Sequence, residues 1–311
     1  MKKYFSFQLK GEDIFKYILL MLILIIVPTL FYLNATGWDQ STRLETSQSV
    51  LFLLLFLVVF FASLAISFFL YKLSIENIEF ENLNPDFKGN LSKFLGIVLK
   101  GIFFTIITIG IYLPWFVKDI YGFFINETSY QDSKFKFQAS GTDLLVIIIL
   151  AAIIPIVILA FLLNDYIEPG HKFSFPRYLA NILETIVIAP FTFFYIRWII
   201  NLSYRNYKIK LNTDYMEGIG VVLLQTFLAA LTFGIYYPLA YLKIYQYFLQ
   251  KTQIKSDTGE NVNLGYELDA TNDFLFIWGQ TLLTIITIGI YAPWAYCKVM
   301  ERVLGKTYLE E

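Results

Sequence analysis

The sequence has little of the chemistry that most enzymes and metalloproteins need. It contains one cysteine, Cys297, and one histidine, His171, among 311 residues. A single cysteine excludes an intrachain disulfide and any Cys-x-x-Cys motif, and a single histidine leaves too few ligands for a zinc site. Nucleotide-binding glycine loops, Gly-x-Ser-x-Gly and His-Glu-x-x-His are absent from the sequence. We therefore expect no enzyme, no cofactor and no bound metal.

Charge is also scarce. Only 16% of the residues are charged and 57% are hydrophobic, whereas soluble domains have about 25% and 45–50%. The net charge of −1 gives no basic excess for binding nucleic acid. The apolar residues gather in seven blocks, each close to the roughly 20 residues that a helix needs to cross a bilayer. The blocks are 14–33, 50–71, 94–117, 144–163, 179–200, 219–242 and 274–297.

The N-terminal residues must be distinguished from a secretory signal peptide. Lys2 and Lys3 precede the first block, as they would in a signal peptide. The block at 14–33 is longer than the usual apolar region of about 7–15 residues, and no Ala-x-Ala site follows. We therefore interpret it as a retained span, with the N-terminus in the cytoplasm.

Short polar segments between the blocks alternate apolar and polar residues. Residues 4–9 read YFSFQL and residues 134–138 read KFKFQ. Such alternation is typical of strands and not of helices. The sequence therefore predicts a mainly α, polytopic membrane protein of about 5–7 membrane-embedded helical segments, with short β segments at the cytoplasmic face.

Internal repetition is the most informative feature of the sequence. FQLKGED at 7–13 recurs as FQASGTD at 137–143, and a looser copy, YELDATND, lies at 266–273. A second motif, Gly-Ile-Tyr-x-Pro, begins at Gly110, Gly234 and Gly289. The first and last copies follow the identical residues TIITI. These matches predict a repeat unit at 1–128, a second at 129–258 and a truncated third at 259–311.

These motifs carry a family resemblance. The phrase Thr-x-Gly-Ile-Tyr-x-Pro-Trp, a basic helix, an Asn-x-Thr/Ser element at 126–128 and 201–203, and a Phe-x-Phe strand together resemble the YjgN family of bacterial inner-membrane proteins. The resemblance covers most of the chain, although Leu239 replaces the motif tryptophan and 34–93 matches less clearly. It implies a multi-pass location in the bacterial inner membrane and no activity, since the family is a domain of unknown function.

The basic residues distinguish two membrane topologies. If every block crossed the bilayer once, 12 basic residues would lie on one side and 11 on the other, without the usual cytoplasmic excess. In an alternative, the first and second blocks and the fourth and fifth blocks form full hairpins. The other three turn back at Gly-Ile-Tyr-x-Pro, where proline interrupts a helix. Only Arg43, Lys172 and Arg177 would then lie outside, and 20 basic residues would be cytoplasmic. We favour this second topology, and simple crossing stays open.

Polar side chains inside the apolar blocks are candidates for a polar path. Lys100 and Glu184 are the charges well inside blocks, where charge is rare and often functional. We hypothesise that they pair; alternatively Lys100 extends to the interface. The uncharged candidates are Thr108, Thr232 and Thr287, two residues before the motif glycines, and Gln225 and Gln280, nine residues before. They line a path or, alternatively, hydrogen-bond neighbouring helices.

The Gly-Ile-Tyr-x-Pro motif predicts the same structural turn at three places in the chain. Its candidate residues are Gly110, Pro114, Trp115, Gly234, Pro238, Gly289, Pro293 and Trp294. Their aromatic neighbours Tyr112, Tyr236 and Tyr291 are expected as interface anchors, with ligand binding as the alternative.

Three aspartates open apolar blocks at matching positions: Asp13, Asp143 and Asp273. Capping of a helix start is the expected role, and an ion or proton site is the alternative. His171 follows Pro-Gly in a loop, where an exposed residue is expected more than a pH sensor. Cys297 is expected to pack in the interior.

The sequence leaves two functions open. A transporter or channel would use the repeats, the broken helices and the polar residues in the membrane. A membrane scaffold would dock a partner through the β segments, because strand edges need neighbours. A membrane enzyme is the least supported. The bilayer is the expected partner, a protein partner or a second copy stays open, and no nucleic acid is expected.

Overall fold

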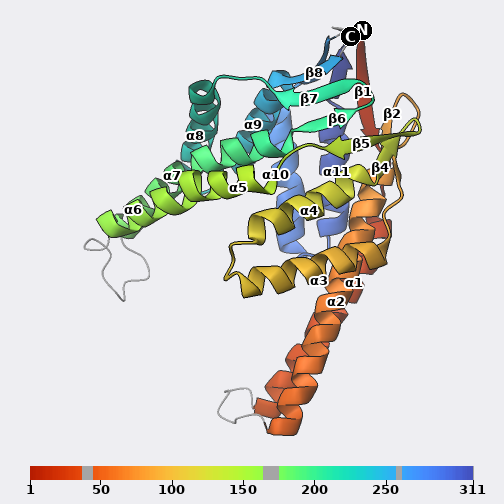
Figure 1. Cartoon of the computed structure of the whole chain (residues 1–311), viewed down its shortest axis with the longest axis vertical. Helices are drawn as coiled ribbons and strands as arrows, with labels where there is room; N and C mark the ends of the chain where they lie inside the picture. Colours follow the sequence, from red (N-terminus) through yellow and green to blue (C-terminus); the bar gives the residue numbers. More distant parts are fainter. Residues whose placement is uncertain (37–44, 164–174, 257–260, 311) are drawn as a thin grey trace.

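The structure is a computed structural model that describes residues 1–36, 45–163, 175–256 and 261–310 (Figure 1). Strands and helices alternate in this part of the chain. The strands are β1 (Lys2–Phe7), β2 (Ile78–Phe80), β3 (Asp86–Phe87), β4 (Thr128–Tyr130), β5 (Ser133–Phe137), β6 (Leu202–Tyr204), β7 (Tyr207–Leu211), β8 (Thr252–Ser256), β9 (Asn261–Tyr266) and β10 (Thr307–Glu310). The helices are α1 (Gly11–Thr36), α2 (Thr46–Glu76), α3 (Leu91–Ile107), α4 (Leu113–Asn126), α5 (Gly141–Ile148), the π-helix η1 (Ile149–Ile153), α6 (Ile154–Leu163), α7 (Phe175–Ile199), α8 (Tyr215–Leu231), α9 (Tyr237–Lys251), α10 (Ala270–Ile286) and α11 (Ala292–Leu304).

The described strands form one antiparallel sheet in the order β2-β1-β10-β9-β8-β7-β6-β5-β4-β3. The terminal strands of the chain pair with each other, with Lys2 opposite Glu310. The two edge strands, β2 and β3, are joined by only residues 81–85. The Tyr130 hydroxyl of β4 also donates to the Phe80 carbonyl of β2 at 2.8 Å. The sheet therefore curls into a partly open ring, in which the edge strands β2 and β3 lie close together without a backbone ladder between them in the described residues.

Alternation along the strands gives the ring two different faces. Lys134 and Lys136 of β5 are exposed on the outside, whereas Phe135 between them points inward with the other apolar side chains. The strands expected at 4–9 and 134–138 are thus confirmed as β1 and β5. Phe5 and Phe135 line the inside of the ring, whereas Phe7 and Phe137 pack in clusters where the helices meet the strands.

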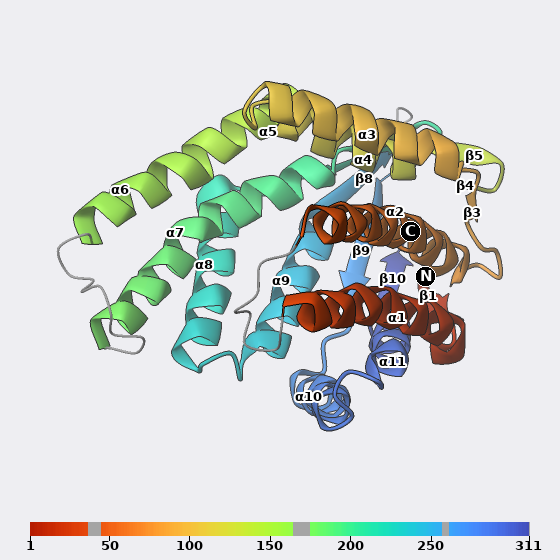
Figure 2. The ribbon, with the colours of Figure 1, turned by 90° about the horizontal axis from the view of Figure 1, so that it is seen from below.

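Five helix pairs extend from one end of the ring in the described part of the chain: α1 with α2, α3 with α4, α5–α6 with α7, α8 with α9, and α10 with α11. Figure 1 shows the sheet and both termini at one end and the helices at the other, and Figure 2 shows the pairs set around the sheet. Each helix pair follows one strand and leads into the strand that is hydrogen-bonded to it in the ring. Both ends of a pair therefore lie on the same side of the molecule.

The recurring structural unit is a strand, two helices and a strand, and it occurs five times in the described residues. The boundaries expected at 128 and 258 separate pairs of such units approximately, and the division into 1–128, 129–258 and 259–311 stays a prediction. Each of the first two expected repeats contains one long unit and one short unit: 2–80 with 86–130, and 133–204 with 207–256.

Three described helices are long and apolar enough to cross a membrane: Gly11–Thr36, Thr46–Glu76 and Gly141–Leu162. Their apolar side chains are largely exposed, for example Leu53 and Val58 of α2. The helices α3, α8 and α10 have 17 residues each, which gives about 25 Å at 1.5 Å per residue, less than the bilayer core of about 30 Å. The structure supports a membrane protein with three candidate spans, fewer than the 5–7 embedded segments expected.

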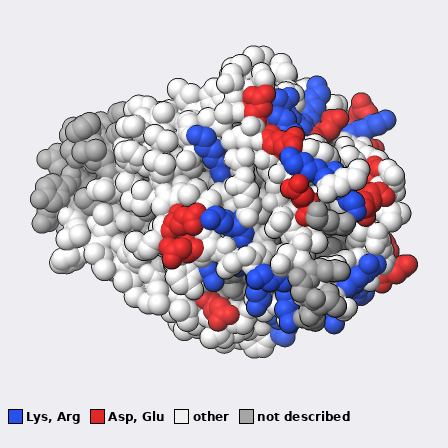
Figure 3. Space-filling model, turned by 90° about the horizontal axis from the view of Figure 1, so that it is seen from above, with Lys and Arg blue, Asp and Glu red and all other residues white. Residues whose placement is uncertain are grey.

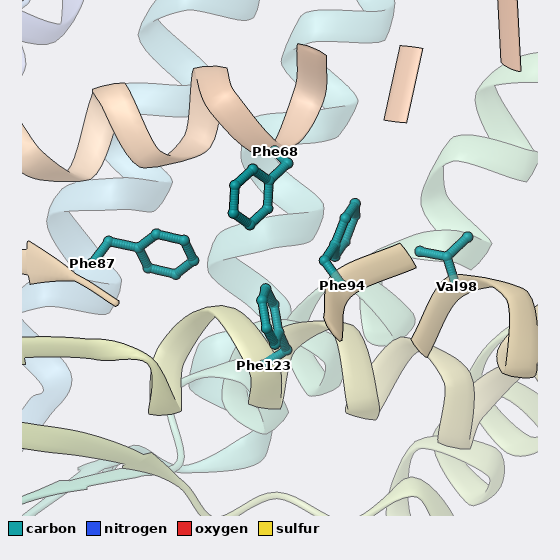
Figure 4. Close-up of a cluster of buried hydrophobic side chains, with 5 residues drawn as sticks. All are labelled: Phe68, Phe87, Phe94, Val98 and Phe123. Atoms are coloured by element: carbon teal, nitrogen blue, oxygen red, sulfur yellow. The ribbon is translucent and has the colours of Figure 1, made fainter. Parts of the chain in front are cut away.

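The protein core lies where the helices meet the ring. One cluster contains Phe68 of α2, Phe87 of β3, Phe94 and Val98 of α3, and Phe123 of α4 (Figure 4). The ring centroids of Phe94 and Phe123 are 5.7 Å apart, within the range for favourable aromatic pairs. Charged side chains of both signs gather on the face above the strands, as Figure 3 shows, and the end with α6 carries few. This separation of charge and apolar surface fits a ring outside the bilayer and helices inside it.

Candidate functional site

The three Gly-Ile-Tyr-x-Pro motifs form the turns of the short helix pairs α3–α4, α8–α9 and α10–α11. In each turn the motif glycine has a φ of 85–88°, and the residue before it has a φ of 51–52°. The N–H of the glycine donates to the carbonyl five residues earlier at 2.7–2.8 Å. This is the bonding of a Schellman helix ending, and only the glycine position is free of side-chain strain. Gly110, Gly234 and Gly289 therefore reverse the chain.

The motif threonines complete the same turns. The hydroxyl oxygens of Thr108, Thr232 and Thr287 accept the N–H of the tyrosine four residues later at 2.9–3.1 Å. Each hydroxyl also donates to the carbonyl four residues earlier at 2.7–2.8 Å. The tips are apolar and open: Ile109 and Ile288 are 93% and 92% exposed. Backbone polar groups in lipid must be bonded within the protein, so these threonines make the tips compatible with a bilayer.

The motif prolines and tryptophans fix the second helix of each short pair. Pro114, Pro238 and Pro293 lie in the first turns of α4, α9 and α11, where a proline leaves no backbone acceptor unsatisfied. Trp115 packs on Gly141 of α5, and Trp294 packs on Gly11 of α1. A Cβ on either glycine would lie 2.5–2.6 Å from the indole ring, so both glycines permit a close contact. Leu239 stands at the equivalent position of the third motif.

The candidate glutamines bond within their own helix pairs. Gln225 accepts the Tyr236 hydroxyl at 2.8 Å, and Gln280 accepts the Tyr291 hydroxyl at 2.9 Å. The equivalent position in the α3–α4 pair is Gly101, whose space is filled by the ring of Phe116. The threonines and glutamines thus belong to three separate hairpins, and the structure does not bring them together along one path.

The two charged candidates are placed on different helices. Lys100 of α3 is exposed, which is consistent with extension of its chain toward the interface. Glu184 lies in α7, but its side chain is outside the described residues, so the proposed pair with Lys100 stays a prediction. His171 also lies outside the described residues.

The three aspartates have different surroundings. Asp13 and Asp143 are exposed in the first turns of α1 and α5. The cap of α5 is Ser140, whose hydroxyl oxygen accepts the Asp143 N–H at 3.1 Å, so the capping role expected of Asp143 is wrong. Asp273 is only 1% exposed and accepts hydrogen bonds from Arg302 at 2.7 Å and Lys306 at 2.6 Å. Burial alone would raise the pKa of Asp273, but the bonds from Lys306 and Arg302 hold it below 3.8. Asp273 therefore anchors α10 to the end of α11.

Cys297 has a simpler role. It is buried in the cluster with Phe7, Leu9 and Ile14. Burial raises the pKa of its thiol to about 11, so the reactive thiolate is scarce at neutral pH. No group of three His, Cys, Asp or Glu side chains in the described part of the chain is arranged to hold a metal ion.

The inside of the ring lines an apolar pocket of about 400 Å³ that is open on part of its boundary, and we call this pocket the chamber. Apolar side chains from strands all around the ring contribute to it, and none of the described residues that line it is charged. They are Phe5, Ile78, Phe80, Pro85, Tyr130, Phe135, Tyr204, Tyr207, Ile209, Ile254, Val262, Leu264 and Leu309. Pockets for small molecules are typically about 300–1,000 Å³ and mostly apolar, so the chamber has the size and lining of a binding site.

The polar atoms of two chamber tyrosines are used by the ring itself. The Tyr204 hydroxyl donates to the Tyr130 carbonyl at 2.7 Å, as the Tyr130 hydroxyl does to Phe80. Burial raises the pKa of both hydroxyls above 10.0. The two tyrosine side chains therefore line the chamber, and their hydroxyls bond to the backbone. The alternation of the strands was visible in the sequence, but the closure of the ring that turns it into a chamber was not.

A model of the family described as "Bacterial protein of unknown function (DUF898)" matches residues 82–260, more than half of the chain. The chain belongs to this family. The match confirms the resemblance to the YjgN family, which is the same family. It covers the helix pairs from α3 to α9 and most of the ring, and it carries no activity. No curated protein and no solved structure matches the chain.

Proposed function

We propose that the protein binds a hydrophobic molecule with an acyl-chain-like tail in the chamber and carries it between the bilayer and the ring. The observation that supports this most directly is the chamber of about 400 Å³ with its uncharged lining. Burial of apolar surface drives such binding. The long exposed apolar helices α1 and α2 support a location in the membrane, where such molecules are abundant.

This proposal narrows the transport hypothesis. A channel for ions or polar solutes would require polar groups along one route, and the candidate threonines and glutamines are each bonded within separate helix pairs. The chamber is apolar. Cargo of the same character fits it, whereas a hydrated ion would lose its water without replacement.

The scaffold hypothesis stays an untested alternative. It rested on strands that need neighbours, and the described strands find those neighbours within the chain. A partner could still bind the charged outer face of the ring, but no feature of that face specifies one.

The proposal is tested by titrating the full-length protein in mild detergent with a fluorescent long-chain fatty acid. We expect saturable binding by the natural protein. Ile254→Trp places an indole in the chamber and should weaken binding by about tenfold or more. Gln253→Trp is the matched control, because its position on the same strand faces away from the chamber lining. Equal affinities of Ile254→Trp and the natural protein would contradict the proposal.

A further inference from the structure

A second apolar cavity, of about 580 Å³, lies where α1, α2 and α11 meet the ring. We call it the side cavity. Its lining includes Ile18 of α1, Leu70 and Ser74 of α2, and Met300 of α11. Ile78 of β2 lines both the side cavity and the chamber. A single side chain therefore belongs to the wall between the two spaces.

The side cavity has a counterpart elsewhere in the fold that can be located by strand register. Phe7 pairs with Ile78 in β1–β2, as Phe137 pairs with Leu202 in β5–β6. The bond from the Gln8 N–H to the Asn77 carbonyl is repeated, at the same 2.9 Å, between Gln138 and Asn201. Counting back three residues from these asparagines places Ser74 of α2 at the position of Trp198 in α7.

The counterpart is filled. Trp198 is buried, and its ring lies 5.8 Å from that of Tyr121 and 5.2 Å from that of Phe137. Its indole N–H donates to the Ser140 carbonyl at 2.8 Å. The Tyr121 and Tyr195 hydroxyls bond each other at 3.0 Å. Aromatic side chains thus fill the space between α4, α5 and α7.

The side cavity remains because two of these large side chains are replaced. Serine stands at position 74 in place of tryptophan, and Met300 stands eleven residues after its motif glycine, where Tyr121 stands in the other copy. The Tyr296 hydroxyl reaches across to the Ser74 hydroxyl at 3.2 Å. Aromatic side chains therefore fill this position at one place in the ring, and the equivalent position is left as a partly open apolar pocket at the other.

We propose that the side cavity holds the acyl chain of a bilayer lipid and is the route by which that chain reaches the chamber past Ile78. Two of the three helices that line it, α1 and α2, are candidate membrane spans with exposed apolar side chains, and they run side by side (Figure 2). The side cavity as a lipid site stands on its own lining, and its role as a route rests on the proposed function.

The experiment uses the full-length protein in phospholipid vesicles that contain a fatty acid with a photoactivatable diazirine in its chain. After illumination, labelled peptides are mapped by mass spectrometry. We expect label on the peptide with Leu70 and Ser74 from the side cavity, and on the peptide with Ile254 from the chamber. Ser74→Trp copies the natural filling by Trp198 and should remove the first label and slow the second. Val58→Trp, on the exposed face of the same helix, is the matched control and should change neither.

The outcomes separate the two proposals. Chamber label without side-cavity label, or unchanged chamber labelling in Ser74→Trp, would overturn the route and leave the proposed function standing. Side-cavity label without chamber label would contradict the proposed function and leave the lipid site standing. Absence of both labels would overturn both. Met300→Tyr, which copies Tyr121, should reproduce the effect of Ser74→Trp and protects the result against misfolding of one variant.

Discussion

Asp273 shows how differently one position is used in the three short helix pairs. It lies 16 residues before its motif glycine and bonds Arg302, 13 residues after that glycine. In the α3–α4 pair the same two positions hold Phe94 and Phe123, whose rings pack together. In the α8–α9 pair the first position is Gly218, covered by a phenylalanine of α7. Equivalent positions of the three short helix pairs are thus occupied by an ion pair, by an aromatic pair, and by a glycine covered by a ring from α7.

We expect Asp273→Asn to lower the free energy of unfolding by about 3 kcal/mol, because it removes the buried carboxylate that bonds two partly buried cations, Arg302 and Lys306. The folded-state pKa of Asp273 is depressed, so the loss should be full at neutral pH and shrink only as the pH falls below about 4. Unfolding in mild detergent, followed by circular dichroism at several pH values, measures this.

Glu217→Gln is the control at this scale. Glu217 pairs with Lys251 at 2.8 Å, but both side chains are substantially exposed, and exposed pairs contribute at most about 1 kcal/mol. Equal losses in the two variants would show that the Asp273 network does not carry the stability assigned to it.

The turn is the element on which the short helix pairs depend. Its glycine and threonine are recognisable in the sequence because the spacing recurs three times. The role of the threonine could not be recognised in the sequence, because a threonine in an apolar block is equally compatible with a polar path. The structure shows each threonine saturating the backbone of a turn at an exposed apolar tip. Sequence reasoning identified the residues and left their role open.

Gly289→Ala should destabilise the α10–α11 pair by about 1–2 kcal/mol, because the φ of Gly289 is 85° and an L side chain is strained there. Space is not the cause, as a Cβ at Gly289 would meet no atom within 4 Å. Gly279 in α10 has equally open surroundings and helical backbone, so Gly279→Ala should instead stabilise by about 0.5–1 kcal/mol. Thermal unfolding of both variants measures the two changes in stability. Changes of the same sign would contradict the role of the turn.

At the scale of the whole molecule, the sequence predicted apolar helices and short strands, which the structure contains, and it missed the ring. Closure depends on pairing between β1 and β10, at opposite ends of the chain. The two-residue strand β3 also takes part. Pairing over such distances leaves no local pattern, and a strand of two residues has too little alternation to detect. The chamber and the side cavity could therefore not be predicted from the sequence. Most chamber residues lie on strands, whereas the side cavity is lined mainly by residues of α1, α2 and α11.

The ring also makes a prediction about sidedness. Every described helix pair leaves and returns at the ring, so all strand turns should lie on one side of the membrane. In the favoured topology this side is the cytoplasm. In a Cys297→Ser background, Asp132→Cys in the exposed β4–β5 turn should react with a membrane-impermeant thiol reagent only in opened cells. Ile288→Cys at a helix tip should resist the reagent in intact and opened cells. Labelling of Asp132→Cys in intact cells would place the ring outside.

The central claim is that the chamber holds a hydrophobic molecule, and native mass spectrometry of the purified full-length protein tests it most directly. The account predicts a bound species that is released on activation, is soluble in organic solvent and contains a long hydrocarbon chain. It should be largely lost from Ile254→Trp and retained by Gln253→Trp. Empty natural protein, purified from membranes in a detergent that preserves other lipid complexes, or equal occupancy in both variants, would contradict the account.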